Sequence, residues 1–258
     1  KDSHPQESCP KTLAATQRLS LQERASDKSK EVGRASKPAN AWLHNVTACT
    51  AVDPLVASTP INIDKLEEDL TDHPDRVFVA TLVSGLREGF DTGLKVLPSE
   101  SMECRNLRSA QAEAEFVTEA LLSEVEKGYV IGPYATPPFP VYRVSPLGVA
   151  IGKYSGKKRL IIDLSAPHDN PRHKSLNELI NKDDYSLSYV RIDDAIQAIT
   201  RYGRGAGLCK CDIVDAFKLC PIKPELWHLY GVKWQGEYYF YCRLAFGSRS
   251  SPKLFDYL

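Results

Sequence analysis

The sequence contains no apolar run near the roughly 18 residues that a membrane-spanning helix requires. It also has no C-x-x-C pair and no secretory signal segment, and its 7 Cys are an odd number. These absences argue against a membrane protein and against a secreted domain held by disulfides. We therefore expect an intracellular protein, in the cytoplasm or nucleus, with reduced thiols and no membrane partner.

Four of the cysteines stand among strand-forming residues, so we expect them to fill the core: Cys209, Cys211, Cys220 and Cys242. A zinc cluster that joins cysteines to His168 and His173 is the alternative. Its ligand spacing fits no usual zinc finger, so core packing is the preferred interpretation.

The chain also lacks an excess of charge of either sign, since 33 basic residues balance 33 acidic ones. Any contact with nucleic acid must therefore be local. One stretch, residues 143–174, carries seven Lys or Arg against two Asp, a local excess of five positive charges. A charge run of this kind is usually a solvated loop face. This run includes residues 158–165 (KRLIIDLS), which resemble the fingers strand of reverse transcriptases, so we favour phosphate contact.

Methionine is almost absent: the only one is Met102, and the chain begins with Lys1, so we expect a fragment of a longer protein. Residues 1–58 carry too few apolar side chains to offset the entropy lost on ordering, which predicts a flexible leader. Residues 59–108 predict a small helical module. Its apolar residues recur at helical spacing in two runs: Ile63, Leu66 and Leu70, then Phe78, Leu82 and Leu86.

The segment 211–217 is the centre of the site that the sequence predicts. It follows the apolar residues 206–209, which predicts a buried strand that delivers a carboxylate to a site. Asp212 and Asp215 are three residues apart, so on a regular strand they would point to opposite faces. Asp212 is therefore the candidate metal ligand, while residues 215–217 can form a pocket floor. The alternative is two Asp at the frayed end of an ordinary strand.

Residues 149–163 predict a β-hairpin whose tip lies near Ser155-Gly156. The tip is basic, and Lys153 and Arg159 can both reach one anion. Arginine adds a planar fork of donors that suits a triphosphate. The alternative is an exposed hairpin with ordinary solubilising lysines.

Downstream, residues 230–234 and 238–244 alternate as paired strands across a Gln235-Gly236 turn. These strands lead into Phe246-Gly247, where a glycine lets backbone approach a ligand closely. A helix is then predicted from Ser251-Pro252, with proline in its first turn.

Two longer helices are predicted between these elements. The first covers residues 109–127 and ends before Gly128. The second covers residues 192–202, and its apolar side chains are expected to face inward: Ile192, Ala195, Ile196 and Ile199.

Three of these segments resemble consecutive motifs of reverse transcriptases. Segment 212–217 (DIVDAF) resembles motif A, and segment 158–165 (KRLIIDLS) resembles the fingers strand whose Arg grips the incoming triphosphate. Segment 244–255 (LAFGSRSSPKLF) resembles motif B, usually written L-P-x-G-x-x-x-S-P-x-L-F. The resemblance covers about residues 112–258. Residues 73–90 also resemble the segment before the polymerase in DIRS-like retrotransposons.

The resemblance implies an α+β fold in which residues 109–258 form a partial right-hand polymerase, with fingers and the first half of the palm. It implies an RNA-directed DNA polymerase that uses dNTPs, a primed RNA or DNA template, and two Mg²⁺ or Mn²⁺ ions in the complete enzyme. Carried over residue by residue, Asp212 is catalytic and binds metal through its carboxylate, and Ile213 binds metal through its carbonyl.

The same resemblance assigns residues to the nucleotide and to the nucleic-acid strand. Those implied to bind the dNTP are Lys153, Arg159, Asp215, Ala216, Phe217, Phe246 and Gly247. Within this set the Phe217 ring is expected to lie under the sugar and exclude a 2′-hydroxyl. The residues assigned to nucleic acid are Lys157, Lys158 and Arg249.

The sequence departs from the family pattern in two respects. Ala245 stands where motif B usually has proline, which leaves the turn less rigid. The Y-x-D-D hairpin with the other metal-binding carboxylates is not in the sequence. We therefore expect residues 1–258 to be inactive alone, with the rest of the palm, the thumb and ribonuclease H in the missing part of a parent polyprotein.

Two other functions remain open at this point. One is a non-catalytic nucleic-acid-binding or interaction remnant of a retroelement. The other is a viral RNA-dependent RNA polymerase, against which Phe217 counts, because an enzyme that uses ribonucleotides needs room for the 2′-hydroxyl.

Overall fold

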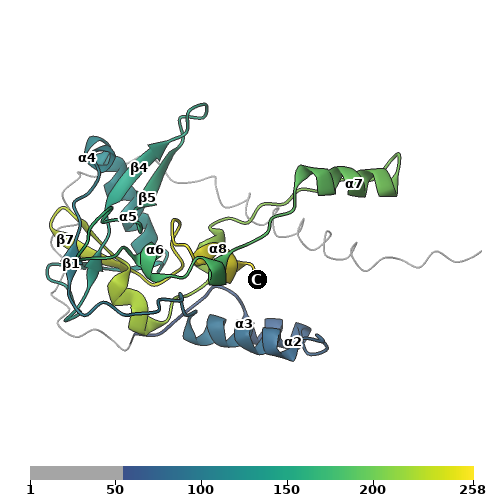
Figure 1. Cartoon of the computed structure of the whole chain (residues 1–258), viewed down its shortest axis with the longest axis horizontal. Helices are drawn as coiled ribbons and strands as arrows, with labels where there is room; N and C mark the ends of the chain where they lie inside the picture. The colour runs from purple at the N-terminus through teal and green to yellow at the C-terminus, as the bar shows by residue number, and fades with distance from the viewer. Residues whose placement is uncertain (1–54) are drawn as a thin grey trace, which may run out of the picture. The chain divides into compact units, whose positions relative to one another are not determined.

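The computed structural model describes residues 55–258, which form one mixed α+β unit (Figure 1). Most of the predicted leader, residues 1–54, lies outside the described residues. The helices are α2 (Ile63–Asp69), α3 (Arg76–Glu88), α4 (Arg108–Ala112), α5 (Ala114–Glu126), α6 (Leu176–Leu179), α7 (Ile192–Tyr202) and α8 (Ser251–Phe255). Short 3-10 helices are η1 (Asp183–Tyr185), η2 (Ala216–Leu219) and η3 (Pro224–Leu229). None of the helices within residues 55–258 is both long and apolar enough to cross a membrane.

Five strands form the main sheet in the order β1-β3-β6-β7-β2. They are β1 (Met102–Glu103), β2 (Val130–Tyr134), β3 (Arg143–Val144), β6 (Gly231–Trp234) and β7 (Glu237–Tyr241). β3 pairs in parallel with β1 and β6, whereas β7 pairs antiparallel with β6 and β2. The predicted turn joins β6 to β7, because Gln235 and Gly236 have the positive φ values, 50° and 91°, that a two-residue hairpin turn requires.

A second, two-stranded sheet is the predicted basic hairpin. β4 (Leu147–Ile151) pairs antiparallel with β5 (Lys158–Ile162), and Ala150 lies opposite Arg159. Gly156, at the predicted tip, has φ of 64°, a value that favours glycine. The hairpin prediction is confirmed.

The hydrophobic core lies between the main sheet, the helices and the inner ends of the hairpin strands. Leu86 of α3, Leu121 of α5, Leu147 of β4 and Tyr241 of β7 are fully buried members of one cluster. The two helices predicted within residues 59–108 are present, and the longer one packs into the same core as the sheet. Asn62 and Asp75 cap these two helices, since each side chain accepts a hydrogen bond from the backbone N–H three residues later.

The predicted helix over residues 109–127 is instead two helices, α4 and α5. Glu113 interrupts them with φ of −118° and ψ of 41°, values outside the helical region. Gly128 follows α5 with φ of 68°, as predicted for the residue after a helix end.

The predicted strand leading to Asp212 is wrong. Residues 206–214 have no regular secondary structure, and Cys209 and Cys211 are exposed rather than core residues. A strand needs a neighbour for its backbone groups, and the free edges of the described sheet are β1 and β2, neither of which pairs with this segment. Cys220 and Cys242 are buried, as predicted.

The predicted inward face of α7 is also wrong. The helix forms where expected, but it is exposed along its entire length. Ile192 and Ile196 are 74% and 54% exposed. Helical spacing of apolar residues shows that a helix has an apolar face, but it cannot show whether the described residues cover that face.

Candidate functional site

The contact that defines the site joins two segments that resemble different motifs. The ring of Phe217, in η2, lies 4.7 Å from the ring of Phe246, with the two planes tilted by 40°. Phe217 also packs edge-on against Phe255 of α8, at 5.7 Å between ring centroids. Phe217 is half-buried, whereas Phe246 is 55% exposed. The pair therefore presents an aromatic surface to solvent.

A buried ion pair holds the turn that carries Phe217. The side chain of Lys218 is 5% exposed, and its Nζ lies 2.8 Å from a carboxylate oxygen of Glu124 on α5. Its Nζ also lies over the Tyr241 ring, 4.1 Å from the centroid. Burial lowers the pKa of Lys218, while the Glu124 carboxylate acts in the opposite direction. Because Lys218 directly follows Phe217, this ion pair fixes the direction of the neighbouring ring.

Asp215 begins the same turn in a left-handed conformation, with φ of 51°. Its carboxylate lies 3.0 Å from Nζ of Lys127, and this contact raises the pKa of Lys127. The carboxylate is therefore already paired with Lys127 at the end of α5, and the Asp215 carbonyl accepts from the backbone N–H of Lys218 at 2.7 Å. The backbone N–H groups of Asp215 and Ala216 are the part left for a ligand.

Gly247 brings the second segment against the end of the hairpin. Its φ is 94°, and a Cβ at this position would lie 2.9 Å from the carbonyl oxygen of Ile162. Asn177 joins the same two segments, since its Nδ2 donates to the Gly247 carbonyl at 2.9 Å and to Ser165 Oγ at 2.8 Å. Its Oδ1 accepts from the backbone N–H of Arg249 at 2.8 Å.

The sequence analysis did not identify Asn177, Glu124 or Lys127 as site residues. Asn177 lies inside the capping box formed by Ser175 and Glu178, a pattern that is visible in the sequence. That pattern predicts the start of α6, but it does not predict that Asn177 reaches residues 70 positions away. Glu124 and Lys127 reach the site through ion pairs with residues distant in the sequence, and a single sequence does not indicate such pairs.

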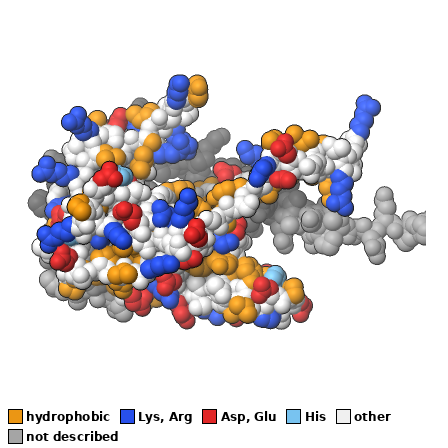
Figure 2. All heavy atoms as spheres, viewed as in Figure 1, with side chains coloured by type: hydrophobic (Ala, Val, Ile, Leu, Met, Phe, Trp, Pro, Cys, Tyr) orange, Lys and Arg blue, Asp and Glu red, His pale blue; other side chains and the backbone are white. Residues whose placement is uncertain are grey.

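The basic hairpin places cations on two faces. Lys153, Lys157 and Arg159 are exposed, and Figure 2 shows Lys and Arg side chains at the end of this hairpin. Side chains alternate along a strand, so Lys158 lies on the face opposite Arg159. There its Nζ contacts Glu113 at 2.6 Å. Lys158 is therefore already paired within the protein, whereas Arg159 makes no ion pair within residues 55–258.

Arg249 is the other residue assigned to nucleic acid. It is half-buried, and its Nη1 donates to the carbonyl of Ile180 at 2.8 Å. This contact fixes the side chain next to Gly247 and leaves part of the guanidinium open.

The candidate metal ligands are not gathered with other acids. Asp212 and Ile213 are exposed, and Asp212 has no hydrogen-bond or ion-pair partner among the described residues. Asp163, at the end of β5, contacts His168 at 2.8 Å, so His168 is also engaged. Within residues 55–258 no three acidic, His or Cys side chains lie close enough to hold a metal ion together. The carboxylate of Asp212 and the carbonyl of Ile213 are oxygen donors, the type of ligand that hard divalent cations prefer.

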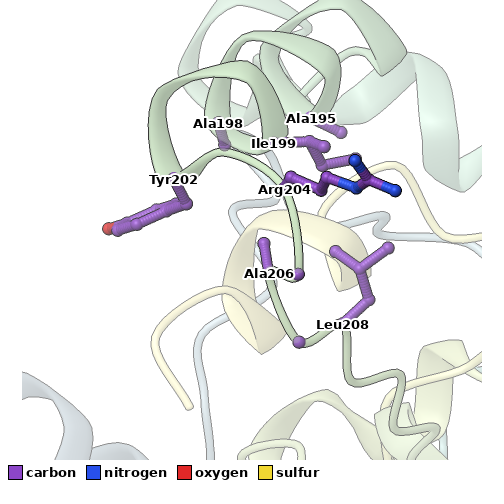
Figure 3. Close-up of a pocket in the computed structure, with 9 residues that line it drawn as sticks. Ala195, Ala198, Ile199, Tyr202, Arg204, Ala206 and Leu208 are labelled. Carbon is purple, nitrogen blue, oxygen red and sulfur yellow. The ribbon is translucent and has the colours of Figure 1, made fainter.

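A pocket of about 610 Å³ lies beside the segment that leads to Asp212. Figure 3 shows that α7 supplies Ala195, Ile199 and Tyr202 to one side, while Ala206 and Leu208 lie on the other. The pocket is mostly apolar, and none of the predicted site residues lines it.

No protein-family model matches this chain, and no curated protein matches it in sequence. Solved structures of foamy viral protease–reverse transcriptases are similar to part of it. The complex with double-stranded DNA has 14% identity and a TM-score of 0.39, over 78% of this chain and 42% of that one. The complex with an RNA/DNA hybrid has 13% identity and a TM-score of 0.39, over 79% and 27%. The native prototype foamy virus protein has 18% identity and a TM-score of 0.37, over 78% and 25%. The chain therefore spans between a quarter and about two-fifths of the length of these structures.

Proposed function

We propose that this chain is part of a reverse transcriptase, an RNA-directed DNA polymerase of a retroelement, and comprises its fingers and the first half of its palm. The contact of Phe217 with Phe246, next to Gly247 and the end of β5, supports this proposal most directly. It brings together three segments that are distant in sequence, each of which resembles a motif of the family. The resemblance of residues 73–90 favours a DIRS-like element.

In the proposed reaction a primer 3′-hydroxyl attacks the α-phosphate of a dNTP, and pyrophosphate leaves. Lys153 and Arg159 neutralise the triphosphate, for which the fork of Arg159 is suited. The backbone N–H groups of Asp215 and Ala216 also donate to it. Charge neutralisation without rearrangement at the moment of reaction is a large part of catalysis in phosphoryl transfer.

The aromatic pair would hold the rest of the nucleotide. The Phe217 ring lies under the sugar and excludes a 2′-hydroxyl, while Phe246 and Gly247 line the base and sugar pocket. The ion pair of Lys218 with Glu124 keeps the Phe217 ring in place. Mg²⁺ or Mn²⁺ held by Asp212 and Ile213 would supply neutralisation of the phosphate charge.

The second candidate function is a non-catalytic nucleic-acid-binding remnant. The exposure of residues 207–214 favours it, because Asp212 lies in this segment and belongs to no group of three possible metal ligands among the described residues. The two functions share the basic hairpin and differ in nucleotide selection, which depends on Phe217.

The basic hairpin should give weak, sequence-independent binding to a single-stranded oligonucleotide. Each phosphate contact releases counterions, so log K should fall by about 0.7 per contact for each tenfold rise in salt. Replacing Lys153, Lys157 and Arg159 together with Gln should therefore reduce the slope by up to about 2, measured by fluorescence anisotropy at several salt concentrations.

The matched control replaces three exposed lysines outside the hairpin, Lys65, Lys95 and Lys182, with Gln. It removes the same charge and should leave the slope unchanged. An equal effect of the two triple variants would refute the assignment of the hairpin to phosphate contact.

Residues 1–258 alone should not extend a primer. Two divalent ions about 3.5–4 Å apart need several anionic ligands, and Asp212 is the only carboxylate of the proposed site without a partner among residues 55–258. The assay uses a primed RNA template, dNTPs and Mg²⁺ or Mn²⁺, beside an Asp212→Asn control. Template-dependent extension that disappears in the control would show that a second carboxylate reaches the site.

A further inference from the structure

A second pocket, of about 440 Å³, lies away from the aromatic pair. It is formed by the segment 96–100, the segment 171–174 and Arg143 of β3. A volume of this size is within the range of small-molecule sites, which is about 300–1,000 Å³. None of the residues proposed to bind the dNTP lines this pocket.

Arg143 is the unusual member of the lining. It is 5% exposed, and its guanidinium is held by Nη1, which donates to the carbonyl of Lys174 at 2.6 Å. Its buried Nε has no hydrogen-bond partner among the described residues, and no carboxylate in residues 55–258 forms an ion pair with it. A buried charge is costly unless an opposite charge or hydrogen bonds compensate it. Arg143 therefore has unused donor capacity and an uncompensated positive charge beside the pocket.

The rest of the lining adds positive charge and an apolar wall. Arg172 and Lys174 belong to the lining, and the only ion pair among the described lining residues joins Arg172 to Glu100 at 3.4 Å between exposed side chains. An exposed ion pair of this length contributes little, so it leaves Arg172 free to exchange partners. Val96 and Leu97, 65% and 54% exposed, form the apolar wall of the pocket.

We propose that this pocket binds a phosphate ester, with the phosphate against Arg143, Arg172 and Lys174 and the organic part against Val96 and Leu97. An inorganic anion would leave the apolar wall and most of the volume unused. A nucleoside monophosphate and a nucleic-acid strand both present the required group. The proposal does not depend on the proposed polymerase function.

Titration of ¹⁵N-labelled protein tests this proposal, with AMP, adenosine and a short single-stranded oligonucleotide as separate probes at constant ionic strength. AMP should shift the amide resonances of residues 96–100 and 171–174 in a saturable way, and adenosine should not. Arg172→Gln combined with Lys174→Gln should weaken this binding by about tenfold or more, because hydrogen bonds to charged groups are lost. Lys65→Gln combined with Arg201→Gln, a matched control of two exposed cations that do not line the pocket, should leave it unchanged.

Arg143→Lys keeps the charge but removes the fork, so it should also weaken AMP binding. If Arg143→Lys unfolds because Arg143 is buried, the double variant of the exposed residues Arg172 and Lys174 still tests the proposal. Tighter binding of the oligonucleotide than of AMP would identify a nucleic-acid strand as the ligand, and equal binding would identify a free nucleotide. The proposal fails if neither probe gives saturable shifts at these residues, or if the double variant binds as the wild type does.

Discussion

Replacing Glu124 with Gln should destabilise the protein by about 3 kcal/mol, because it leaves the Lys218 ammonium buried without an opposite charge. The two side chains are 5% and 27% exposed, so solvent reaches the carboxylate better than the ammonium, and the loss should lie at the lower end of the usual range for a broken buried pair. Chemical denaturation with urea measures the change directly, as a lower midpoint at constant slope.

Glu126→Gln is the matched control, since Glu126 ends the same helix, is exposed and makes no ion pair with the described part of the chain. That variant should change the free energy of unfolding by less than about 0.5 kcal/mol. Combining Glu124→Gln with Lys218→Met should restore much of the loss, because the buried charge is removed with its partner. A Glu124→Gln variant as stable as the Glu126→Gln variant would mean that the ion pair does not hold this turn.

Gly247→Ala should be the most damaging single change within the proposed site. The residue has φ of 94°, which costs a residue with a side chain about 1–2 kcal/mol. The new Cβ would also lie 2.9 Å from the Ile162 carbonyl oxygen, and overpacking of this kind costs roughly 1–3 kcal/mol more. The chain must then move away from β5, which carries Phe246 away from Phe217 and should weaken nucleotide binding as well.

Gly128→Ala separates the two causes. Gly128 also has a positive φ, 68°, but a Cβ there would meet nothing within 4 Å. This control should therefore show the backbone cost alone, and the excess loss in Gly247→Ala should come from the contact with Ile162. Equal losses in the two variants, measured by thermal or urea unfolding, would contradict the close packing of Gly247 on the hairpin.

Local patterns predicted the local elements well. The basic hairpin, the β6–β7 turn at Gln235-Gly236, the two helices of the module and the proline-initiated helix α8 all depend on turn residues, caps or apolar spacing within a few positions. These signals depend only on residues that are neighbours in the chain, so they can be recognised in a single sequence.

The predictions that failed depend on contacts with residues distant in the sequence rather than on local conformation. Residues 206–214 have an apolar, strand-like composition, but a strand forms only where another strand pairs with it, and no described strand does. The apolar face of α7 failed as a core prediction for the same reason. The links made by Asn177 and Glu124 were missed because a single chain gives no sign of which distant residue a polar side chain will meet.

The roles of the site residues in nucleotide binding are still predictions. What the structure adds is that Phe217 and Phe246, assigned from different segments, contact each other. The same geometry assigns no role to the pocket beside α7, which contains none of the residues proposed to act on the nucleotide.

The most direct test of the proposed function is the ratio of affinities for a deoxynucleoside triphosphate and the matching ribonucleoside triphosphate, measured by titration of residues 1–258 in Mg²⁺. The wild type should prefer the deoxynucleotide, because in the proposed site the Phe217 ring would occupy the space that a 2′-hydroxyl needs. Phe217→Ala should open that space and reduce the preference by roughly tenfold, with little loss of deoxynucleotide affinity. Phe255→Leu, which changes the ring behind Phe217, should largely keep the preference. An identical ratio in the wild type and Phe217→Ala would contradict the account, since Phe217 would then be a packing residue and the site would not select deoxynucleotides.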